Sequence, residues 1–402
     1  MAVSAYEDYT GRWAPALRCT SPLRLCIVCA ISQATTGYAR VIVFSHELFS
    51  IQNYGGVTRC MVELMRALHS RQADWLVWAG RHGSEPLEAF RQEPGVEAHV
   101  IAKPAGSLPG RLHASVPNEW GFRRFLRAQG KGIVHRTQYA ICDMVPRGYA
   151  KVSTLHDMWT EREDASLDER VRSAFKRRAL EASDAIICVS EYSRQALTEV
   201  WPHLADKAVT IHHGVRPVSS NLLLAREPSP YFLFVGAREL RKNFPILLRA
   251  LEITPTLKSF HLLCVGGGPF TDEEARLIVD SGLGDQVYQR AATDDELAGL
   301  YEAAVALLYP STFEGFGMPL LEGMLHGCPV ISSPLTCLPE IGGDAAIYAS
   351  ASHPEAWGNA MESLAFDAVA GAGARERGRE RALHFSWAKS AECHSEVYAS
   401  LS

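Results

Sequence analysis

The stretch AVALLYPSTFEGFGMPLLEGMLHGCPVISS, residues 304–333, contains an apolar strand, a helix and a second apolar strand. Pro319 suits the first turn of the helix, because the N–H that proline lacks would have no partner there. Gly327 suits the end of the helix, and Pro329 prevents its continuation. Continuous apolar strands separated by helices are typical of a parallel sheet that is covered on both faces.

The same alternation continues on both sides of this stretch. Apolar, β-branched runs in the first half of the chain occupy residues 41–46, 75–80, 132–136, 151–157, 184–190 and 208–214. Runs of the same kind in the second half occupy residues 231–237, 260–268, 286–290, 304–311, 329–333 and 345–350. Two halves of this kind predict an α/β protein with two doubly wound, Rossmann-like domains, whose ligands bind at the carboxyl ends of the strands.

The breaks between these runs predict the domain boundaries. A polar, proline-containing linker at 219–230 separates an N-terminal domain at 41–218 from a C-terminal domain at 231–385. We expect a final helix at 386–402 to pack back on the N-terminal domain. Residues 1–40 precede the first convincing strand and would be either a weakly ordered extension or the product of an upstream start codon.

Composition restricts the class of protein. The chain has 402 residues, of which 47% are hydrophobic and 21% charged, as in ordinary globular proteins. Its net charge of -5 argues against a nucleic-acid binder, and no apolar run approaches the roughly 20 residues of a membrane span. Cysteines such as Cys188 and Cys264 lie alone in apolar runs, which is typical of reduced cytoplasmic thiols. The pair Cys26 and Cys29 lacks the further ligands that a zinc site needs, so we predict no metal site.

The segment EGFGMPLLE, residues 314–322, offers a binding site for an anion. The helix that begins here leaves the backbone N–H groups near Gly317 and Met318 without partners, and the helix dipole adds positive potential. Glu322, one turn further on, has two acceptor oxygens that match the adjacent hydroxyls of a ribose. Together with Glu314 on the loop, these groups suit a sugar diphosphate, although a helix with two charge-satisfied glutamates would have the same sequence.

The spacing of Glu314 and Glu322, with GFGMP between them, resembles the large retaining GT-B glycosyltransferase family four, which includes bacterial mannosyltransferases. The resemblance covers nearly everything from residue 41 onward and implies two domains that face a central cleft, with the acceptor on the N-terminal side. It implies that Glu322 binds the ribose and Glu314 binds hydroxyls of the donor sugar. The further donor-binding residues implied in this segment are Phe316, Gly317, Met318 and Leu321.

Two cations follow the first strand of the C-terminal domain. The strand ends at Gly236, and Arg241 and Lys242 lie just before a helix for which Asn243 is a plausible N-cap. Such an Arg-Lys pair is usually a surface feature. Here it resembles the family's diphosphate-binding turn, where fixed cations neutralise the leaving group. Many members have an arginine directly after the strand-ending glycine, whereas this chain has Ala237 there and Arg238 one residue later.

The N-terminal domain supplies a second set of candidates. Gly55 and Gly56 precede a helix and resemble the family's glycine loop, because paired glycines allow a phosphate to approach the backbone closely. His156 follows a buried strand, where a histidine is usually structural, and resembles the histidine of a His-Asp turn that reaches the donor sugar. Ser190, in CVSEYSRQAL, is predicted to be a helix N-cap.

The base of the nucleotide is expected to bind in the C-terminal domain. Gly266, in VGGGP, would help to form the wall of the base pocket. Arg290 occupies a position where the family usually has glycine, and an arginine there would stack on or hydrogen-bond a purine. This arginine favours guanine as the base.

The resemblance implies a retaining, metal-independent transfer of a hexose to a saccharide or lipid-linked acceptor in polysaccharide biosynthesis. We predict mannose from GDP-mannose, with the nucleotide sugar as co-substrate and no other cofactor. The catalytic group comprises His156, Arg241, Lys242 and Glu314. Two alternatives remain: another GT-B enzyme such as an epimerase, or a non-catalytic protein that binds a nucleotide sugar.

Two basic, amphipathic segments occupy residues 122–131 and 169–180. The ordinary interpretation is a solvated helix face. The alternative is a peripheral contact with an anionic membrane or a lipid-linked acceptor, which would place the protein in the cytoplasm at the inner face of the membrane.

Overall fold

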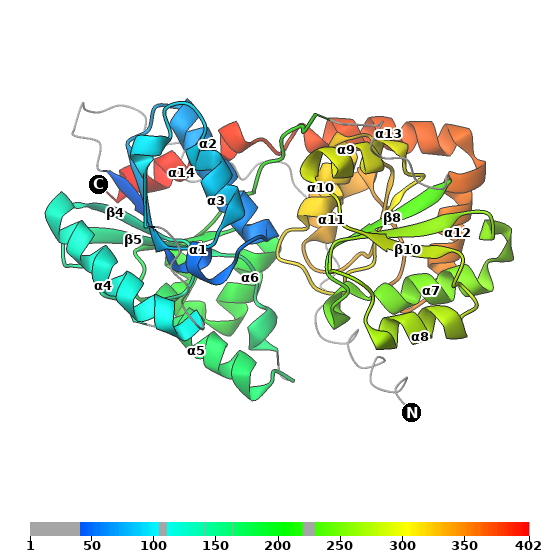
Figure 1. Cartoon of the computed structure of the whole chain (residues 1–402), viewed down its shortest axis with the longest axis horizontal. Helices are drawn as coiled ribbons and strands as arrows, with labels where there is room; N and C mark the ends of the chain where they lie inside the picture. Colours follow the sequence, from blue (N-terminus) through cyan, green and yellow to red (C-terminus); the bar gives the residue numbers. More distant parts are fainter. Residues whose placement is uncertain (1–40, 104–110, 141, 163, 220–229, 402) are drawn as a thin grey trace. The chain divides into compact units, whose positions relative to one another are not determined.

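The computed structural model describes residues 41–103, 111–140, 142–162, 164–219 and 230–401 (Figure 1). The predicted extension at 1–40, with Cys26 and Cys29, and nearly all of the predicted linker lie outside the described residues. The described residues form two compact units. The N-terminal unit contains residues 41–216, Glu314–Met318 and 382–401, and the C-terminal unit contains the rest.

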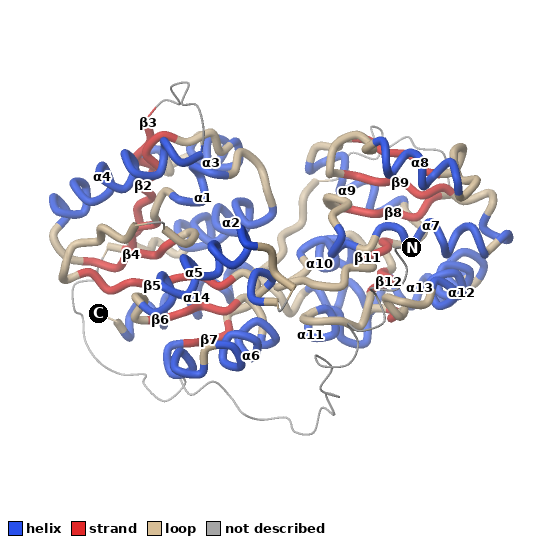
Figure 2. Tube along the Cα trace, turned by 90° about the horizontal axis from the view of Figure 1, so that it is seen from below, coloured by secondary structure: helices blue, strands red, loops and turns tan. Residues whose placement is uncertain are grey.

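The N-terminal unit has a parallel sheet, which in the described residues has seven strands in the order β3-β2-β1-β4-β5-β6-β7 (Figure 2). The strands are β1 Ile42–Phe44, β2 Trp75–Arg81, β3 Val100–Lys103, β4 Gly132–Arg136, β5 Tyr149–Leu155, β6 Ala185–Cys188 and β7 Ala208–Thr210. The strand order runs outward in both directions from β1 and β4. This change of direction creates the crevice in which ligands of doubly wound sheets bind.

Helices cover this sheet because their apolar residues recur on one face. In α2, Cys60, Met61, Leu64, Met65 and Leu68 are buried in the core, where the C-terminal helix α14 packs against them. The helices of this unit are α1 Glu47–Ile51, α2 Gly56–Ser70, α3 Glu85–Arg91, α4 Arg111–Gln129, α5 Leu167–Glu181, α6 Glu191–Val200 and α14 Trp387–Ser400. Short 3-10 turns lie at Glu97–His99, Trp159–Glu161 and Pro202–Lys207.

The C-terminal unit has a second parallel sheet, with six described strands in the order β10-β9-β8-β11-β12-β13. They are β8 Tyr231–Val235, β9 His261–Val265, β10 Val287–Arg290, β11 Leu307–Tyr309, β12 Val330–Ser332 and β13 Ile347–Tyr348. The helices are α7 Phe244–Ile253, α8 Asp272–Asp280, α9 Asp294–Ala303, α10 Met318–Leu325, α11 Leu338–Gly342, α12 Pro354–Phe366 and α13 Ala368–Ala382. Helix α10 begins at Met318, which groups with the N-terminal unit, and continues into the C-terminal unit.

The predicted α/β architecture with two doubly wound sheets is confirmed, and each predicted apolar run overlaps a strand. The apolar runs did not include β3, a four-residue strand at the edge of its sheet. The expected capping by Asn243 is wrong in detail. Asn243 precedes α7, but it has a left-handed backbone with φ 52° and its side chain donates a hydrogen bond to the Ala351 carbonyl instead of capping the helix.

Candidate functional site

The loop Glu314–Met318 lies at the carboxyl ends of β5 and β6 in the N-terminal unit. The hydroxyls of Ser190 and Ser193 donate hydrogen bonds to the Gly315 carbonyl at 2.7 and 3.2 Å. An ideal Cβ atom on Gly315 would overlap the His156 carbonyl oxygen and would lie 3.1 Å from the Asp157 Cβ. Only glycine therefore fits this position without movement of the backbone. Ser190 also caps α6, as predicted, by accepting a hydrogen bond from the Ser193 N–H.

Aromatic rings hold the next residue of the loop. The Phe316 ring is buried, and its centroid lies 5.0 Å from that of His213 and 6.1 Å from that of Phe385. Glu314 is also buried. Gly317 has a φ of 93°, a conformation that favours glycine, and it turns the chain into α10. The structure thus brings the predicted residues Glu314, Phe316 and Gly317 to the strand end that carries His156.

One ring nitrogen of His156, the buried Nε2 atom, has no hydrogen-bond partner in the described residues. The ring stacks on His213 with 6.1 Å between centroids. Burial lowers the pKa of His156 to about 4, Asp157 acts in the opposite direction, and Lys176 adds to the lowering. The imidazole is therefore neutral at pH 7, and its Nε2 atom can donate or accept one hydrogen bond, depending on the tautomer.

The predicted glycine loop lies at the start of α2. Helix α2 begins at Gly56, and a Cβ atom built on Gly56 would have no protein atom within 4 Å. A Cβ on Gly55 would overlap the side chain of Gln52, which accepts a hydrogen bond from the Thr58 hydroxyl at 2.7 Å. The open space at Gly56 and the N-terminus of a 15-residue helix together suit an anionic group.

The predicted diphosphate cations belong to the C-terminal unit. Arg241 and Lys242 lie in a 3-10 turn after β8. The Lys242 ammonium donates a hydrogen bond to the Tyr309 hydroxyl at 3.2 Å, and its stem passes 4.0 Å from an ideal Cβ on Gly236. The Arg241 carbonyl accepts a hydrogen bond from the Thr312 N–H at 2.7 Å, which ties this turn to the segment after β11. Both cations are partly exposed.

Arg238 has a structural role that the sequence did not indicate. Its side chain is 2% exposed and forms an ion pair with Glu274 at 2.9 Å. The guanidinium donates hydrogen bonds to the carbonyls of Gly266, Gly268 and Pro269 at 2.9, 2.8 and 3.0 Å. Arg238 therefore holds the VGGGP turn in place.

The remaining predicted donor residues lie on helix α10 and at the end of strand β10 in the C-terminal unit. Glu322 on α10 accepts a hydrogen bond from the Tyr301 hydroxyl at 3.3 Å and is partly exposed. Leu321 is fully buried in the core, so a donor could contact its backbone but not its side chain. Arg290 forms an ion pair with Glu296 at 2.7 Å, and its contact with a purine stays a prediction.

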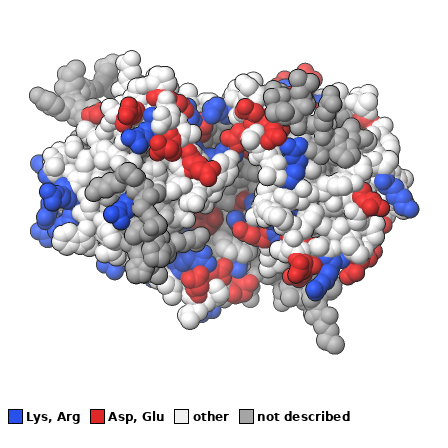
Figure 3. Space-filling view, viewed as in Figure 1, with Lys and Arg blue, Asp and Glu red and all other residues white. Residues whose placement is uncertain are grey.

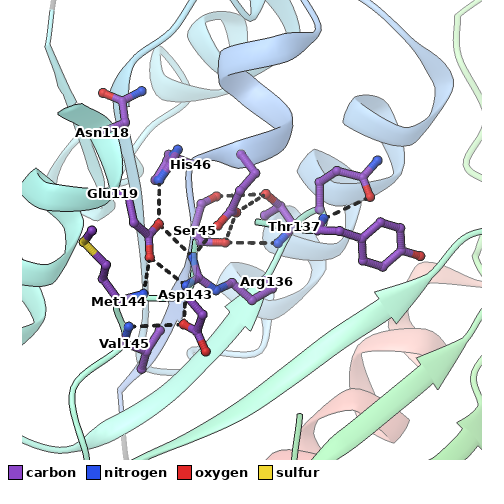
Figure 4. Close-up of polar contacts among 12 residues, drawn as sticks. Ser45, His46, Asn118, Glu119, Arg136, Thr137, Asp143, Met144 and Val145 are labelled. Atoms are coloured by element: carbon purple, nitrogen blue, oxygen red, sulfur yellow. Dashed lines mark hydrogen bonds and ion pairs between the residues drawn. The ribbon is translucent and has the colours of Figure 1, made fainter. Parts of the chain in front are cut away.

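Sequence reasoning missed a buried network at the carboxyl ends of β1 and β4 (Figure 4). The Arg136 guanidinium donates hydrogen bonds to Glu47, to Glu119 at 2.8 Å and to Asp143 at 2.6 Å. His46 contacts Glu119 at 3.1 Å. Burial alone would raise the pKa of Glu119, but the hydrogen bonds from His46 and Arg136 outweigh it and lower the pKa to about 2. The run HELFS, with Arg136 at the end of its strand, was the available signal.

Within this network the ligand atoms of His46, Glu47 and Glu119 lie within 4.8 Å of one another, close enough to share a metal ion. Arg136 already binds both carboxylates. The arrangement is therefore accounted for as a buried ion-pair network that fixes α1 and α4 on the sheet.

The basic segments 122–131 and 169–180 differ in how they face the solvent. On α4, Phe122 and Leu126 are buried while Arg124 and Arg127 are exposed, and Lys and Arg side chains gather over α4 in Figure 3. On α5, Arg172 and Arg177 are exposed, whereas Lys176 is buried. Among the described helices, none is both long enough and apolar enough to span a membrane.

Two family models match the chain in adjacent regions. The model described as "Glycosyltransferase Family 4" matches residues 54–218, and the model described as "Glycosyl transferases group 1" matches residues 229–367. The chain belongs to glycosyltransferase family 4. Membership confirms the resemblance found in the sequence and the predicted enzyme class, and it agrees with the two parallel-sheet units.

Known relatives of this family 4 chain include bacterial mannosyltransferases. It is 32% identical to the "O-antigen chain mannosyltransferase B" of Escherichia coli, over 52% of this chain and 58% of that protein. It is 27% identical to the "O-antigen chain mannosyltransferase RfbU" of Salmonella typhimurium, over 44% of this chain and 50% of that protein. The matches thus span between half and three-fifths of these relatives' own length.

Solved structures confirm the GT-B fold of this family 4 protein. The structure of Anabaena HepE in complex with UDP-glucose has a TM-score of 0.70 and 17% identity, and the comparison covers 90% of this chain and 100% of that one. At this identity the likeness concerns the fold alone.

Proposed function

We propose that this protein moves a hexose from a nucleotide-diphosphate sugar to a saccharide or lipid-linked saccharide in polysaccharide biosynthesis. The observation that carries the proposal is the buried Nε2 atom of His156, which lacks a partner in the described residues. A buried polar atom without a hydrogen bond is costly, and a bound ligand would remove that cost. His156 lies beside Gly315, and Gly315 belongs to the loop that resembles the family's donor-sugar site.

We assign mannose as the sugar and GDP-mannose as the donor. Two relatives are named as mannosyltransferases, and Arg290 supplies a side chain suited to a purine. Glu314 and Glu322 would bind sugar and ribose hydroxyls, and the N–H groups near Gly317 would contact the diphosphate.

The reaction requires charge stabilisation at the leaving diphosphate. The bond from the sugar C1 to the phosphate oxygen breaks, and the acceptor oxygen bonds to C1 from the same face. The configuration at C1 is retained because attack and departure occur on the same face. The acceptor's proton passes to the departing phosphate oxygen. Arg241 and Lys242 neutralise the negative charge that develops there. No step uses a metal ion or another cofactor, and we expect full activity in the presence of a chelator.

A thermal-shift panel with GDP, UDP and ADP sugars tests the donor. A ligand that binds only the folded state raises the melting temperature by mass action, and we expect the largest rise with GDP-mannose. A larger rise with a UDP sugar would overturn the assignment of guanine. Chromatography of the nucleotide sugar without an acceptor separates the alternatives, because an epimerase would convert the donor and a binding protein would leave it unchanged in every assay.

We further propose that α4 contacts an anionic membrane. Val116, Trp120, Arg124 and Arg127 follow one another at spacings of four, four and three residues and share a face of the helix. Trp120 is 66% exposed, and both arginines are exposed. An exposed tryptophan beside cations suits the interface of an anionic bilayer.

Vesicle co-sedimentation tests this contact. We expect binding to vesicles that contain phosphatidylglycerol and loss of binding in Trp120→Ala and in Arg124→Glu/Arg127→Glu. Arg249→Glu, at an exposed position in the C-terminal unit, is the control. Equal binding to zwitterionic vesicles, or unchanged binding in both α4 variants, would contradict the proposal.

A further inference from the structure

Lys176 differs from its basic neighbours on α5. Its side chain is 5% exposed, whereas Arg177, the next residue, is 54% exposed. The sequence offered these residues as parts of one solvated or membrane-facing surface. The helix instead turns Lys176 toward the carboxyl end of β5, where His156 lies.

The Lys176 ammonium contacts the turn that follows His156. Its Nζ atom donates a hydrogen bond to the Asp157 carbonyl at 2.9 Å and another to Glu161 Oε2 at 2.8 Å. Asp157 Oδ1 lies 3.9 Å from the same nitrogen. The ring centroid of Tyr139 lies 5.7 Å from Nζ. Lys176 therefore reaches both the first and the last part of the turn from Asp157 to Glu161.

Short-range bonds also hold the turn between these two contacts. Asp157 Oδ1 accepts a hydrogen bond from the Trp159 N–H at 3.1 Å, and the Thr160 hydroxyl donates to Glu161 at 2.8 Å. These bonds shape the turn. It is attached to α5 by a side-chain hydrogen bond between Trp159 and Glu169 and by Lys176, whose partner Glu161 is 3% exposed. Of the two, Lys176 also binds the carbonyl of Asp157, the residue that follows His156.

We infer that Lys176 is a positioning residue, which fixes the turn from Asp157 to Glu161 so that the imidazole of His156 is held toward the donor sugar. The inference rests on the proposed function, because that function assigns His156 to the sugar. Lys176 does not touch the donor. It acts through the backbone of the residue that follows His156.

A buried ion pair contributes little net stability, because burying two charges removes them from water. Removing one partner leaves a buried, unpaired charge, which is strongly destabilising, whereas replacing both partners with apolar residues of similar volume is often neutral or stabilising. Stability and position can therefore be separated at this site. A double substitution of Lys176 and Glu161 removes the charges but cannot restore the bond to the Asp157 carbonyl.

The first experiment compares Lys176→Met with the double variant Lys176→Met/Glu161→Leu. We expect the single variant to melt at a lower temperature and the double variant to regain stability. In both variants we expect kcat for transfer to fall by about 100-fold, the size of effect produced by a displacement of about 1 Å in an active site, with little change in KM. Recovery of kcat together with stability would show a merely structural role and overturn the inference.

The second experiment reads His156 directly and needs no donor. Nitrogen-15 NMR of the histidine side chains follows the His156 imidazole in the full-length protein without ligand, with His156→Gln to assign its signals. Lys176 lowers the pKa of His156, so Lys176→Met is expected to raise it and to shift both ring-nitrogen resonances. Arg177→Met is the matched control and should leave them unchanged.

The two experiments fail in different ways. Unchanged His156 resonances and an unchanged pKa in Lys176→Met would overturn the role of Lys176, whatever reaction the protein catalyses. Absence of transfer by the wild-type protein with every nucleotide sugar would overturn the proposed function, and the NMR comparison would still test the coupling of Lys176 to His156.

Discussion

The backbone of Gly315 packs directly on the carbonyl oxygen of His156, so that a Cβ atom on Gly315 would overlap this oxygen. The contact joins the start of the EGFGM loop to the end of β5. Two hydroxyls, from Ser190 and Ser193, hold the Gly315 carbonyl on the other side. The loop is thus held by residues that follow β5 and β6, and glycine is required because a Cβ atom would overlap the backbone of the candidate sugar-binding histidine.

Replacing Gly315 with alanine should displace this loop. The added methyl must push away a backbone atom, and we expect a cost of about 1–3 kcal/mol, together with a loss of transfer activity of at least about tenfold. Activity assays and thermal unfolding measure both effects. Gly284→Ala is the control, because a Cβ at Gly284 meets nothing within 4 Å. Wild-type activity in Gly315→Ala would show that the loop tolerates displacement.

Gly56→Ala should affect the ligand and leave the protein intact. A Cβ at this position has no protein atom within 4 Å, so the melting temperature of the unliganded protein should be unchanged. If a phosphate approaches the start of α2, the methyl group will obstruct it, and we expect donor affinity to fall by about tenfold, or about 1.4 kcal/mol. Calorimetric titration with the donor measures the change. Unaltered affinity would remove Gly56 from the donor site.

Lys242→Ala should abolish transfer in a folded protein. Its ammonium is assigned to the leaving diphosphate, and loss of such a group typically costs about 100- to 1,000-fold in kcat. The lost hydrogen bond to Tyr309 should cost only about 1 kcal/mol of stability. Tyr309→Phe removes the same hydrogen bond but keeps the cation, and it should retain most activity. Full turnover by Lys242→Ala would contradict the assignment.

The stability of the N-terminal unit should fall in mild acid. Burial lowers the pKa of both His156 and His394 from 6.5 to about 4. Below about pH 6.5 the unfolded chain binds protons that the folded protein does not bind until about pH 4. The contribution of these two neutral histidines to the free energy of unfolding is therefore complete above pH 6.5. It decreases by about 1.4 kcal/mol per pH unit for each histidine as the pH falls toward 4.

Urea unfolding between pH 7 and pH 4.5 measures this slope. His394→Gln removes one titrating group, so its stability should depend less steeply on pH than that of the wild type, whatever its stability at pH 7. Parallel slopes for the two proteins would show that His394 does not contribute.

Much of the architecture could be predicted because strands that are buried on both faces leave continuous apolar runs. Helix boundaries also followed from local chemistry, as at Ser190 and Pro319, whose effects act within one turn. Strand β3 was missed, although the equally short edge strands β7 and β10 were found from their runs. Asn243 was assigned a cap that its side chain does not provide, because the Ala351 carbonyl, distant in sequence, binds the amide instead.

The sequence by itself determined the two parallel sheets, the family and the residue types at the ends of the strands, because these depend on local pattern and spacing. Only the tertiary structure decided which cationic side chains are exposed on the surface and which are buried and form ion pairs or hydrogen bonds that hold segments together. Arg238, Arg136 and Lys176 resemble the exposed arginines in sequence, yet each is buried among carboxylates or carbonyls. The reason is physical: burial and pairing depend on partners far along the chain, and the spacing of one segment does not reveal them.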